Sequence, residues 1–179
     1  MAHFAQLPSP AVRRLSLAAC AALLVIGVLP AGATAPRGSR ANPYPIRTMA
    51  RLPGSSWKLR VNKAIPNASL AVLGNGTYAV RPDKQFFLIN VTVGYVGKSP
   101  HAVFSAYNLT AVGHSGLSFT QLNDSCGDVR NGLADFRRVA PGRRITGNIC
   151  YWVPKPDARV LVLKYQSSSS RSKVFFTLR

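Results

Sequence analysis

Alternation of apolar and polar residues is the feature of this sequence that most restricts its fold. Residues 86–95 show the alternation most clearly, with Asn90 and Thr92 between the apolar positions. Those apolar positions are Phe87, Ile89, Val91, Val93 and Tyr95. Because successive side chains of a strand point to opposite faces, this spacing predicts a strand with one face in a core.

The same period of two recurs along most of the chain. Residues 145–153 alternate again, which places Cys150 and Trp152 on one face and Ile149, Tyr151 and Val153 on the other. The other expected strands cover residues 57–62, 107–112, 117–121, 160–165 and 174–178, with a short edge strand at 46–50. Turn residues separate them, including a four-residue hairpin loop at 113–116 and breaks at 123–141 and 154–157.

Seven or eight short strands without any helical period after the first thirty-odd residues predict an all-β protein. The expected solution is two antiparallel sheets packed face to face. One core would then be shared by Trp57, Phe87, Ile89, Val91, Ile149, Tyr151 and Leu161.

The first 33 residues have the build of a secretory signal peptide. Arg13 and Arg14 precede an apolar run of about 15 residues, shorter than the roughly 20 that a membrane-spanning helix needs. Small residues around Ala33 fit a cleavage site. The sequence therefore predicts a signal peptide over residues 1–33 and a secreted or envelope-associated protein. Residues 34–56, rich in Pro, Gly and Arg, are expected to form a lead-in or linker, and residues 57–179 the folded domain.

Two alternatives to a cleaved signal stay open. The apolar run could remain as a membrane anchor, or Cys20 could be lipidated, because residues 17–20 match the motif that precedes a lipidated cysteine. However, the most apolar stretch, residues 21–29, follows Cys20, whereas a lipoprotein signal is cut before the cysteine.

Two cysteines, Cys126 and Cys150, remain after the predicted signal. An even count in an oxidising compartment predicts one disulfide between them. The alternative is a pair of buried free thiols, and no C-x-x-C motif supports a redox role.

Charge is the most unusual property of the composition. The chain carries a formal charge of +18, and without Arg13 and Arg14 the charge is +16. Such a field concentrates anionic partners. In an exported protein these are cell-wall polymers, acidic lipids or acidic glycans. The alternative is that the basic residues are simply solvated, since they are spread from Arg37 to Arg179 without a long run.

Three stretches resemble a family of secreted bacterial immunoglobulin-like domains of unknown function, related in fold to a mycobacterial secreted immunoprotective antigen. The first is the strand at 83–93, the second includes Pro141-Gly142 and residues 147–154, and the third is the closing strand at 173–178. The chain departs from the family pattern at 94–97, where a polar turn is usual. The resemblance implies an immunoglobulin-like β-sandwich of seven to eight strands and a secreted location, but no activity.

No catalytic, cofactor or metal motif is found. The chain has no Glu, and its five Asp side chains, at 83, 124, 128, 135 and 157, are expected to make surface ion pairs or turn hydrogen bonds. H-E-x-x-H, Asp-rich calcium loops and G-x-S-x-G are all missing. We therefore expect a non-enzymatic protein without a cofactor.

The densest basic cluster is the candidate anion-binding site, formed by Arg137, Arg138, Arg143 and Arg144 around Pro141-Gly142. The sequence thus favours a cationic binding module that contacts anionic cell-envelope polymers or acidic lipids rather than nucleic acid, because of the compartment. The alternative is a domain that binds one specific extracellular protein.

Overall fold

The computed structural model describes residues 34–72, 81–114, 116–133 and 138–179. Residues Thr34–Arg179 form one compact unit. The predicted signal peptide, with Arg13, Arg14 and Cys20, lies outside the described residues. Within the described ranges, no helix has the length and hydropathy of a membrane span.

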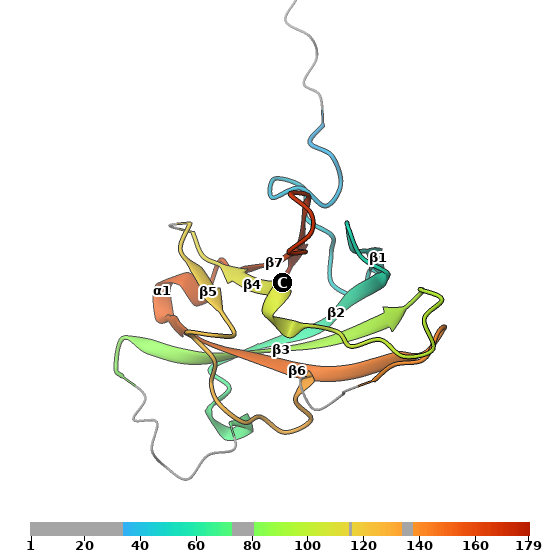
Figure 1. The fold of residues 1–179 in the computed structure, drawn as a ribbon. Coiled ribbons are helices and arrows are strands. Elements are labelled where there is room, and N and C mark those ends of the chain that lie inside the picture. The colour runs from blue at the N-terminus through green and yellow to red at the C-terminus, as the bar shows by residue number, and fades with distance from the viewer. Residues whose placement is uncertain (1–33, 73–80, 115, 134–137) are drawn as a thin grey trace, which may run out of the picture. The chain divides into compact units, whose positions relative to one another are not determined.

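Eight strands build two four-stranded antiparallel sheets in the described part of the chain (Figure 1). The first sheet has the order β1 (Ala50–Arg51), β2 (Trp57–Pro66), β3 (Lys84–Tyr95) and β6 (Arg144–Pro154). The second has the order β5 (Ser118–Thr120), β4 (Leu109–Val112), β7 (Val162–Gln166) and β8 (Lys173–Thr177). Three short helical turns connect strands: η1 (Ser69–Ala71), η2 (Ala106–Asn108) and α1 (Lys155–Ala158).

This strand order is that of an immunoglobulin-like sandwich, as predicted. Strands β2, β3 and β6 occupy the positions of immunoglobulin strands A, B and E, and β5, β4, β7 and β8 those of C′, C, F and G. The disulfide differs, because antibody domains join strands B and F through the core. Here the bond joins Cys126, in the connection from β5 to β6, to Cys150 on β6.

The core lies between the sheets, and alternation along each strand builds it. All seven residues predicted to share one core are buried in it: Trp57, Phe87, Ile89, Val91, Ile149, Tyr151 and Leu161. The second sheet contributes Leu109, Ala111, Leu163, Tyr165 and Phe176. Burial of this apolar surface is the main favourable term in the folding of such a sandwich.

A buried hydroxyl joins the two sheets. The Tyr151 hydroxyl on β6 donates a hydrogen bond to the carbonyl oxygen of Leu109 on β4, at 3.0 Å. Tyr151 is fully buried, and its burial raises the pKa of the phenol well above the usual range. The hydroxyl therefore stays protonated as a donor to the second sheet.

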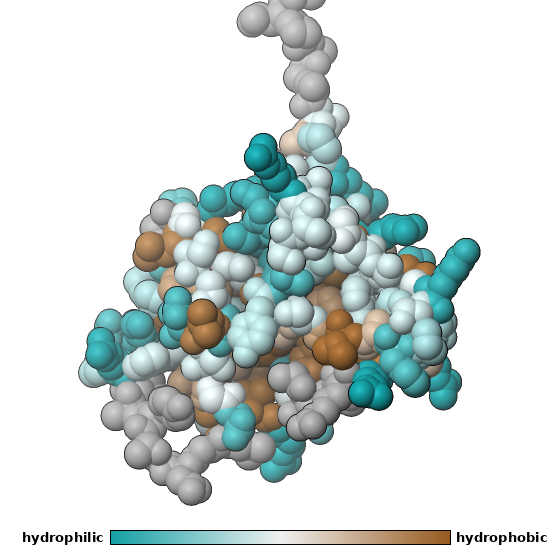
Figure 2. All heavy atoms as spheres, viewed as in Figure 1, coloured by the Kyte–Doolittle hydropathy of each residue, from teal (hydrophilic) through white to brown (hydrophobic). Residues whose placement is uncertain are grey.

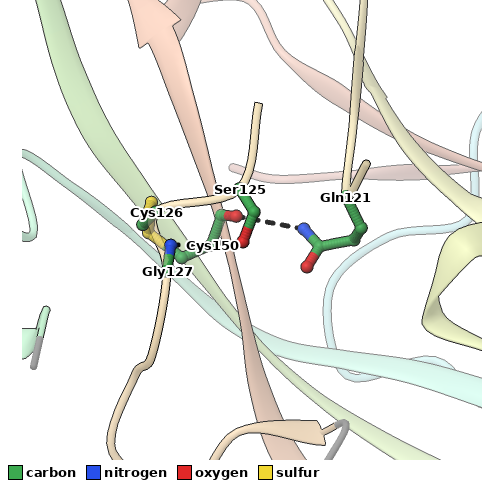
Figure 3. Close-up of a disulfide and its surroundings, with 5 residues drawn as sticks. All are labelled: Gln121, Ser125, Cys126, Gly127 and Cys150. Carbon is green, nitrogen blue, oxygen red and sulfur yellow. Dashed lines mark hydrogen bonds between the residues drawn. A yellow bond between two sulfur atoms is a disulfide. The ribbon is translucent and has the colours of Figure 1, made fainter. Parts of the chain in front are cut away.

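A second, smaller apolar cluster covers half of the outer face of the first sheet. Phe86 and Leu88 of β3 pack there against the disulfide, whose cysteines are both buried. Figure 3 shows the surroundings of the bond. The Gln121 side chain donates a hydrogen bond to the Cys150 carbonyl oxygen at 3.0 Å, and the Gly127 amide donates one to the Ser125 hydroxyl at 3.2 Å.

The connection from β5 to β6 also covers the free edge of β6. Ser125 bridges Tyr151, and Gly132 bridges Asn148. The approach is so close at Gly147 that an added Cβ would lie 2.7 Å from the Cα of Leu133. A strand edge paired in this way is not open to other chains.

Residues 34–56 are part of the sandwich rather than a linker, and the predicted boundary at residue 57 is too late. Tyr44 bridges Phe176 on β8, and Ala50 and Leu52 are buried in the core. The short edge strand β1 begins at Ala50, where the strand predicted for 46–50 was expected to end. The frequent Pro and Gly residues led to the wrong boundary, because they indicate turns but do not indicate whether the residues between the turns pack against the core.

Two local predictions also change. Strands β4 and β5 pair as a hairpin, but Val112 faces Ser118, so the loop has five residues instead of four. Its residue 115 lies outside the described ranges. After β6 the chain forms the single helical turn α1, whose buried Asp157 accepts a hydrogen bond from the His114 amide at 3.1 Å. Four residues are too few to show a helical period.

The disulfide should contribute substantially to stability. The bond closes a loop with a sequence separation of 24 residues. For the double variant Cys126→Ser and Cys150→Ser we expect a loss of about 3 kcal/mol in the free energy of unfolding, through greater freedom of the unfolded chain. Urea unfolding measures the loss. A change below about 1 kcal/mol would mean that packing alone holds the connection in place.

Candidate functional site

The open half of the outer face of the first sheet gathers basic side chains from three of its four strands, β1, β2 and β6. Residues paired across antiparallel strands share a face. The first such row is Arg51, Lys58, Gly94 and Arg144, one residue from each of β1, β2, β3 and β6. Its three basic side chains are all exposed.

This first row places like charges next to each other. Arg51 directly faces Lys58, and Cβ atoms in such a pair are about 5 Å apart. Gly94 has no side chain, and Arg144 lies across it: a Cβ added to Gly94 would be 3.3 Å from the Cγ of Arg144. Arg144 therefore leans from β6 over β3, in the direction of Lys58 on β2.

Two further rows extend the face. They are Arg60, Thr92 and Thr146, followed by Lys63, Asn90 and Asn148. The register shifts between Val61 and Lys63, so that Asn62 and Lys63 both belong to the outer face. The cationic face is defined here as Arg51, Lys58, Arg60, Lys63 and Arg144.

Hydrogen bonds among amides and hydroxyls fix the surface between these cations. Asn62 donates from Nδ2 to Asn90 Oδ1 at 2.8 Å and to Thr92 Oγ1 at 2.9 Å. Arg60 Nε donates to Asn62 Oδ1 at 2.8 Å, and the hydroxyls of Thr92 and Thr146 are 2.8 Å apart. The network continues across β6, where it holds the outer connection.

Asn90 and Asn148 extend the network to that connection. Asn90 Nδ2 donates to Asn148 Oδ1 at 2.7 Å, and Asn148 Nδ2 donates to the carbonyl oxygen of Arg130 at 2.7 Å. Beside them lies a hollow of about 460 Å³ that is lined by polar and apolar residues. They include Lys63, Asn90, Arg130, Asn131 and Asn148 with the apolar Ile65, Leu70 and Leu88. The hollow offers cations and amides beside apolar side chains, of which Leu70 is fully exposed and Leu88 is buried.

Carboxylates do not neutralise this face. None of the three rows contains an acidic residue. In the part of the chain that the structure describes, no Lys or Arg forms an ion pair with a carboxylate. Asp124 accepts a hydrogen bond from the Thr120 amide and Asp157 one from the His114 amide, so of the two predicted roles, surface ion pairs or turn hydrogen bonds, these two residues take the second. The same residues hold no group of three or more His, Cys, Asp or Glu side chains fit to bind a metal ion.

The predicted arginine cluster is only partly brought to this face. Arg144 belongs to the first row, whereas Arg143 lies in the preceding turn, where its carbonyl oxygen accepts a hydrogen bond from the Tyr95 amide. Arg138 lies apart, on the hollow lined by Phe104 and Leu133, and Arg137 lies outside the described residues. The four other cations of the face, Arg51, Lys58, Arg60 and Lys63, were not predicted as site residues from the sequence.

Comparisons with known proteins give a likeness in fold. Neither a protein-family model nor a curated protein matches the chain. Among solved structures, the yjhA protein of Bacillus subtilis is 17% identical, covers 76% of this chain and 99% of its own, and superposes with a TM-score of 0.49. The secreted protein MPT63 of Mycobacterium tuberculosis is 14% identical, covers 67% of this chain and 81% of its own, with a TM-score of 0.47.

A protein of unknown function from Listeria monocytogenes is 13% identical, covers 74% of this chain and 82% of its own, and has a TM-score of 0.46. A secreted mycobacterial protein is thus among the structures to which the chain is similar. At such identities and TM-scores the likeness says nothing about function.

The repulsion within the first row can be measured. Replacing Lys58 with Gln removes the charge that faces Arg51, so the free energy of unfolding at low salt should rise by about 0.5 kcal/mol. The gain should shrink at about 0.3 M salt, where exposed charges are screened. Urea unfolding at both salt concentrations checks this, with the exposed Lys155→Gln as the matched control. A loss of stability in Lys58→Gln would show that the lysine is held by favourable contacts.

Proposed function

We propose that this protein is a secreted or envelope-associated, non-enzymatic binding module whose cationic face contacts anionic polymers of the cell envelope. The observation that carries the proposal is the row Arg51, Lys58 and Arg144, where cations stand together without a carboxylate. A polyanion supplies the opposite charges, and its binding releases condensed counterions.

The fixed surface below the cations supports the same function. The amides of Asn62, Asn90 and Asn148 bond to one another or to neighbouring groups. Cations that project from a fixed surface lose less conformational entropy when they bind. An extended polymer can follow the rows across the four strands, and its hydroxyl groups can reach the amides beside the hollow.

A polymer is favoured over a lipid bilayer. Binding to a bilayer surface depends on buried apolar area as well as on charge. The three rows contain basic, amide and hydroxyl residues together with Gly94, and no aromatic or large aliphatic side chain that could insert among lipids. Binding to acidic lipid is therefore an outcome that the experiment must separate from polymer binding.

A specific protein partner is the second candidate. Val103, Tyr107 and Leu122 are large hydrophobic residues with 65%, 69% and 78% of their surface exposed. Figure 2 shows the apolar residues of the face in view as small separate patches among polar ones. Val103 and Tyr107 line one hollow together with Phe104 and Leu133, so a partner protein would dock there. The polyanion proposal is preferred because charge, and not apolar surface, is the unusual property of the chain.

Salt and charge variants test the proposed function together. The protein, purified from cells that express the full chain, is titrated with purified wall polymer and with acidic vesicles at several salt concentrations. Binding to the polymer should weaken steeply between about 0.05 and 0.3 M salt. The triple variant Arg51→Gln, Lys58→Gln and Arg144→Gln should bind about tenfold more weakly at low salt and lower the slope of log affinity against log salt by about 2–3.

The matched control removes three exposed charges elsewhere, with Lys155→Gln, Arg159→Gln and Arg179→Gln. It should keep most of the affinity. Equal losses in the two triple variants would mean that net charge alone matters and that the face is not a site. Tighter binding to vesicles than to polymer would assign the face to lipid, and binding that salt does not affect would favour a protein partner.

A further inference from the structure

The outer face of the second sheet carries a groove that the proposed function does not use. It has a volume of about 500 Å³ and lies over β4 and β7, beside the serine-rich turn at 167–170. Lys164 belongs to this face because its neighbours Leu163 and Tyr165 point into the core. Six side chains that line the groove carry the argument: Tyr107, Asn108, Thr110, Lys164, Gln166 and Arg171.

The hydrogen-bonding groups of these six side chains are free. None of the six forms a side-chain hydrogen bond or an ion pair with another described residue. The groove differs in this respect from the first sheet, where Asn62, Asn90 and Asn148 are bonded within the protein. Two cations, two amides and two hydroxyls therefore surround one groove and are available to a ligand.

Lys164 is the centre of this arrangement. Its side chain is half-buried between Thr110 on β4 and Phe175 on β8, the residues that it faces across the sheet. Partial burial lowers the pKa of the Lys164 ammonium, and the nearby charge of Lys173 lowers it further. No carboxylate compensates either effect among the described residues. An anion in the groove would supply the missing partner.

The serine turn gives the groove a fixed wall. The hydroxyls of Ser167 and Ser169 are 2.9 Å apart, and the Ser170 amide donates to the Ser167 carbonyl oxygen at 3.2 Å. Arg171 follows this turn directly and is exposed. The exposed ring of Tyr107 lies on the groove and offers an apolar surface to a carbon skeleton.

We propose that this groove binds the phosphate ester of a sugar or polyol, with Lys164 and Arg171 on the phosphate and Tyr107 beside the carbon skeleton. The amides and hydroxyls of the groove complete the hydrogen bonds to phosphate and hydroxyl oxygens. Cations combined with free neutral donors match such a ligand better than a bare carboxylate, which has fewer oxygen atoms to satisfy.

The two sites lie on opposite outer faces of the sandwich, since each sheet turns its other face to the shared core. An anionic chain bound to the cationic face therefore does not block the groove, and a second anionic chain can bind there. If the proposed function holds, a single copy of the domain links two phosphate-bearing chains. This linking activity requires both sites and therefore rests on the proposed function, whereas binding in the groove does not depend on the cationic face.

Binding in the groove is tested with small probes. The protein from cells expressing the full chain is titrated with glycerol 3-phosphate, inorganic phosphate and glycerol, and amide chemical shifts are followed by NMR. Glycerol 3-phosphate should shift the signals of residues 107–110 and 164–171 and bind more tightly than either other probe. The variant Lys164→Gln with Arg171→Gln should lose about tenfold or more in affinity, since two charged hydrogen-bond donors are removed.

Two further variants keep the result interpretable. Arg171→Gln alone changes an exposed residue and leaves the packed stem of Lys164 intact, so it should weaken binding without loss of stability. The control Lys155→Gln with Arg159→Gln should bind like the parent. Unchanged binding in both groove variants, or shifts spread over all basic residues, would overturn the site. Equal affinity for inorganic phosphate would overturn the assignment of the carbon skeleton.

Linking is tested with beads that carry covalently attached polyglycerol phosphate. The protein should clump the beads, and the groove variant should coat them without clumping. If the parent does not clump the beads but the groove variant still coats them, linking is wrong and the cationic face still stands. If the parent does not coat them at all, the proposed function fails, while the NMR titration still decides the groove. Clumping by the groove variant would point to self-association and would overturn linking through the groove.

Discussion

The pairing of β3 with β6 is the interaction on which the other features of the molecule depend. Eleven consecutive pairs, from Lys84 with Pro154 to Gly94 with Arg144, run without a break. Because side chains alternate, this register sends both residues of one pair into the core and both residues of the next pair to the outer face. A slip by one residue would expose the core and bury the polar rows. The sandwich core and the candidate site are therefore specified by the same register.

The outer face is divided along these two strands. Near Phe86 and Trp152 it is apolar and lies under the connections that the disulfide holds. Near Gly94 and Arg144 it is open and basic. The amide and hydroxyl network lies between the two halves, and its bonds satisfy groups that would otherwise be left partly buried without partners. The disulfide shapes the site indirectly, because it anchors the connection over the apolar half, and that connection borders the hollow beside Lys63.

The structure could be predicted from the sequence where the local period of apolar residues determines the fold. Alternation predicted the sandwich and its core, and the Trp57-Lys58-Leu59-Arg60 segment already placed Lys58 and Arg60 on one polar face. The candidate sites could not be predicted in this way, because they form where strands far apart in sequence pair with each other. The meeting of Arg51 with Lys58 depends on the position of the edge strand, and the groove depends on the pairing of Thr110 with Lys164. Residues 137–144 are the densest basic cluster along the sequence, but which cations are close in space depends on strand register, which sequence spacing does not contain.

The alternative of simply solvated charges accounts for the composition, whereas the proposals rest on how the charges are arranged. A chain with 23 Lys and Arg residues against five acidic ones must expose many unpaired cations. Repulsion is lowest when those cations are spread apart, and like charges directly opposite on neighbouring strands oppose folding. Arg51 and Lys58 stand in that position, and Arg144 leans toward them over Gly94. Lys164 is half-buried without a counterion on the opposite face. Both arrangements oppose folding of the isolated protein, and the proposed anionic ligands would relieve both.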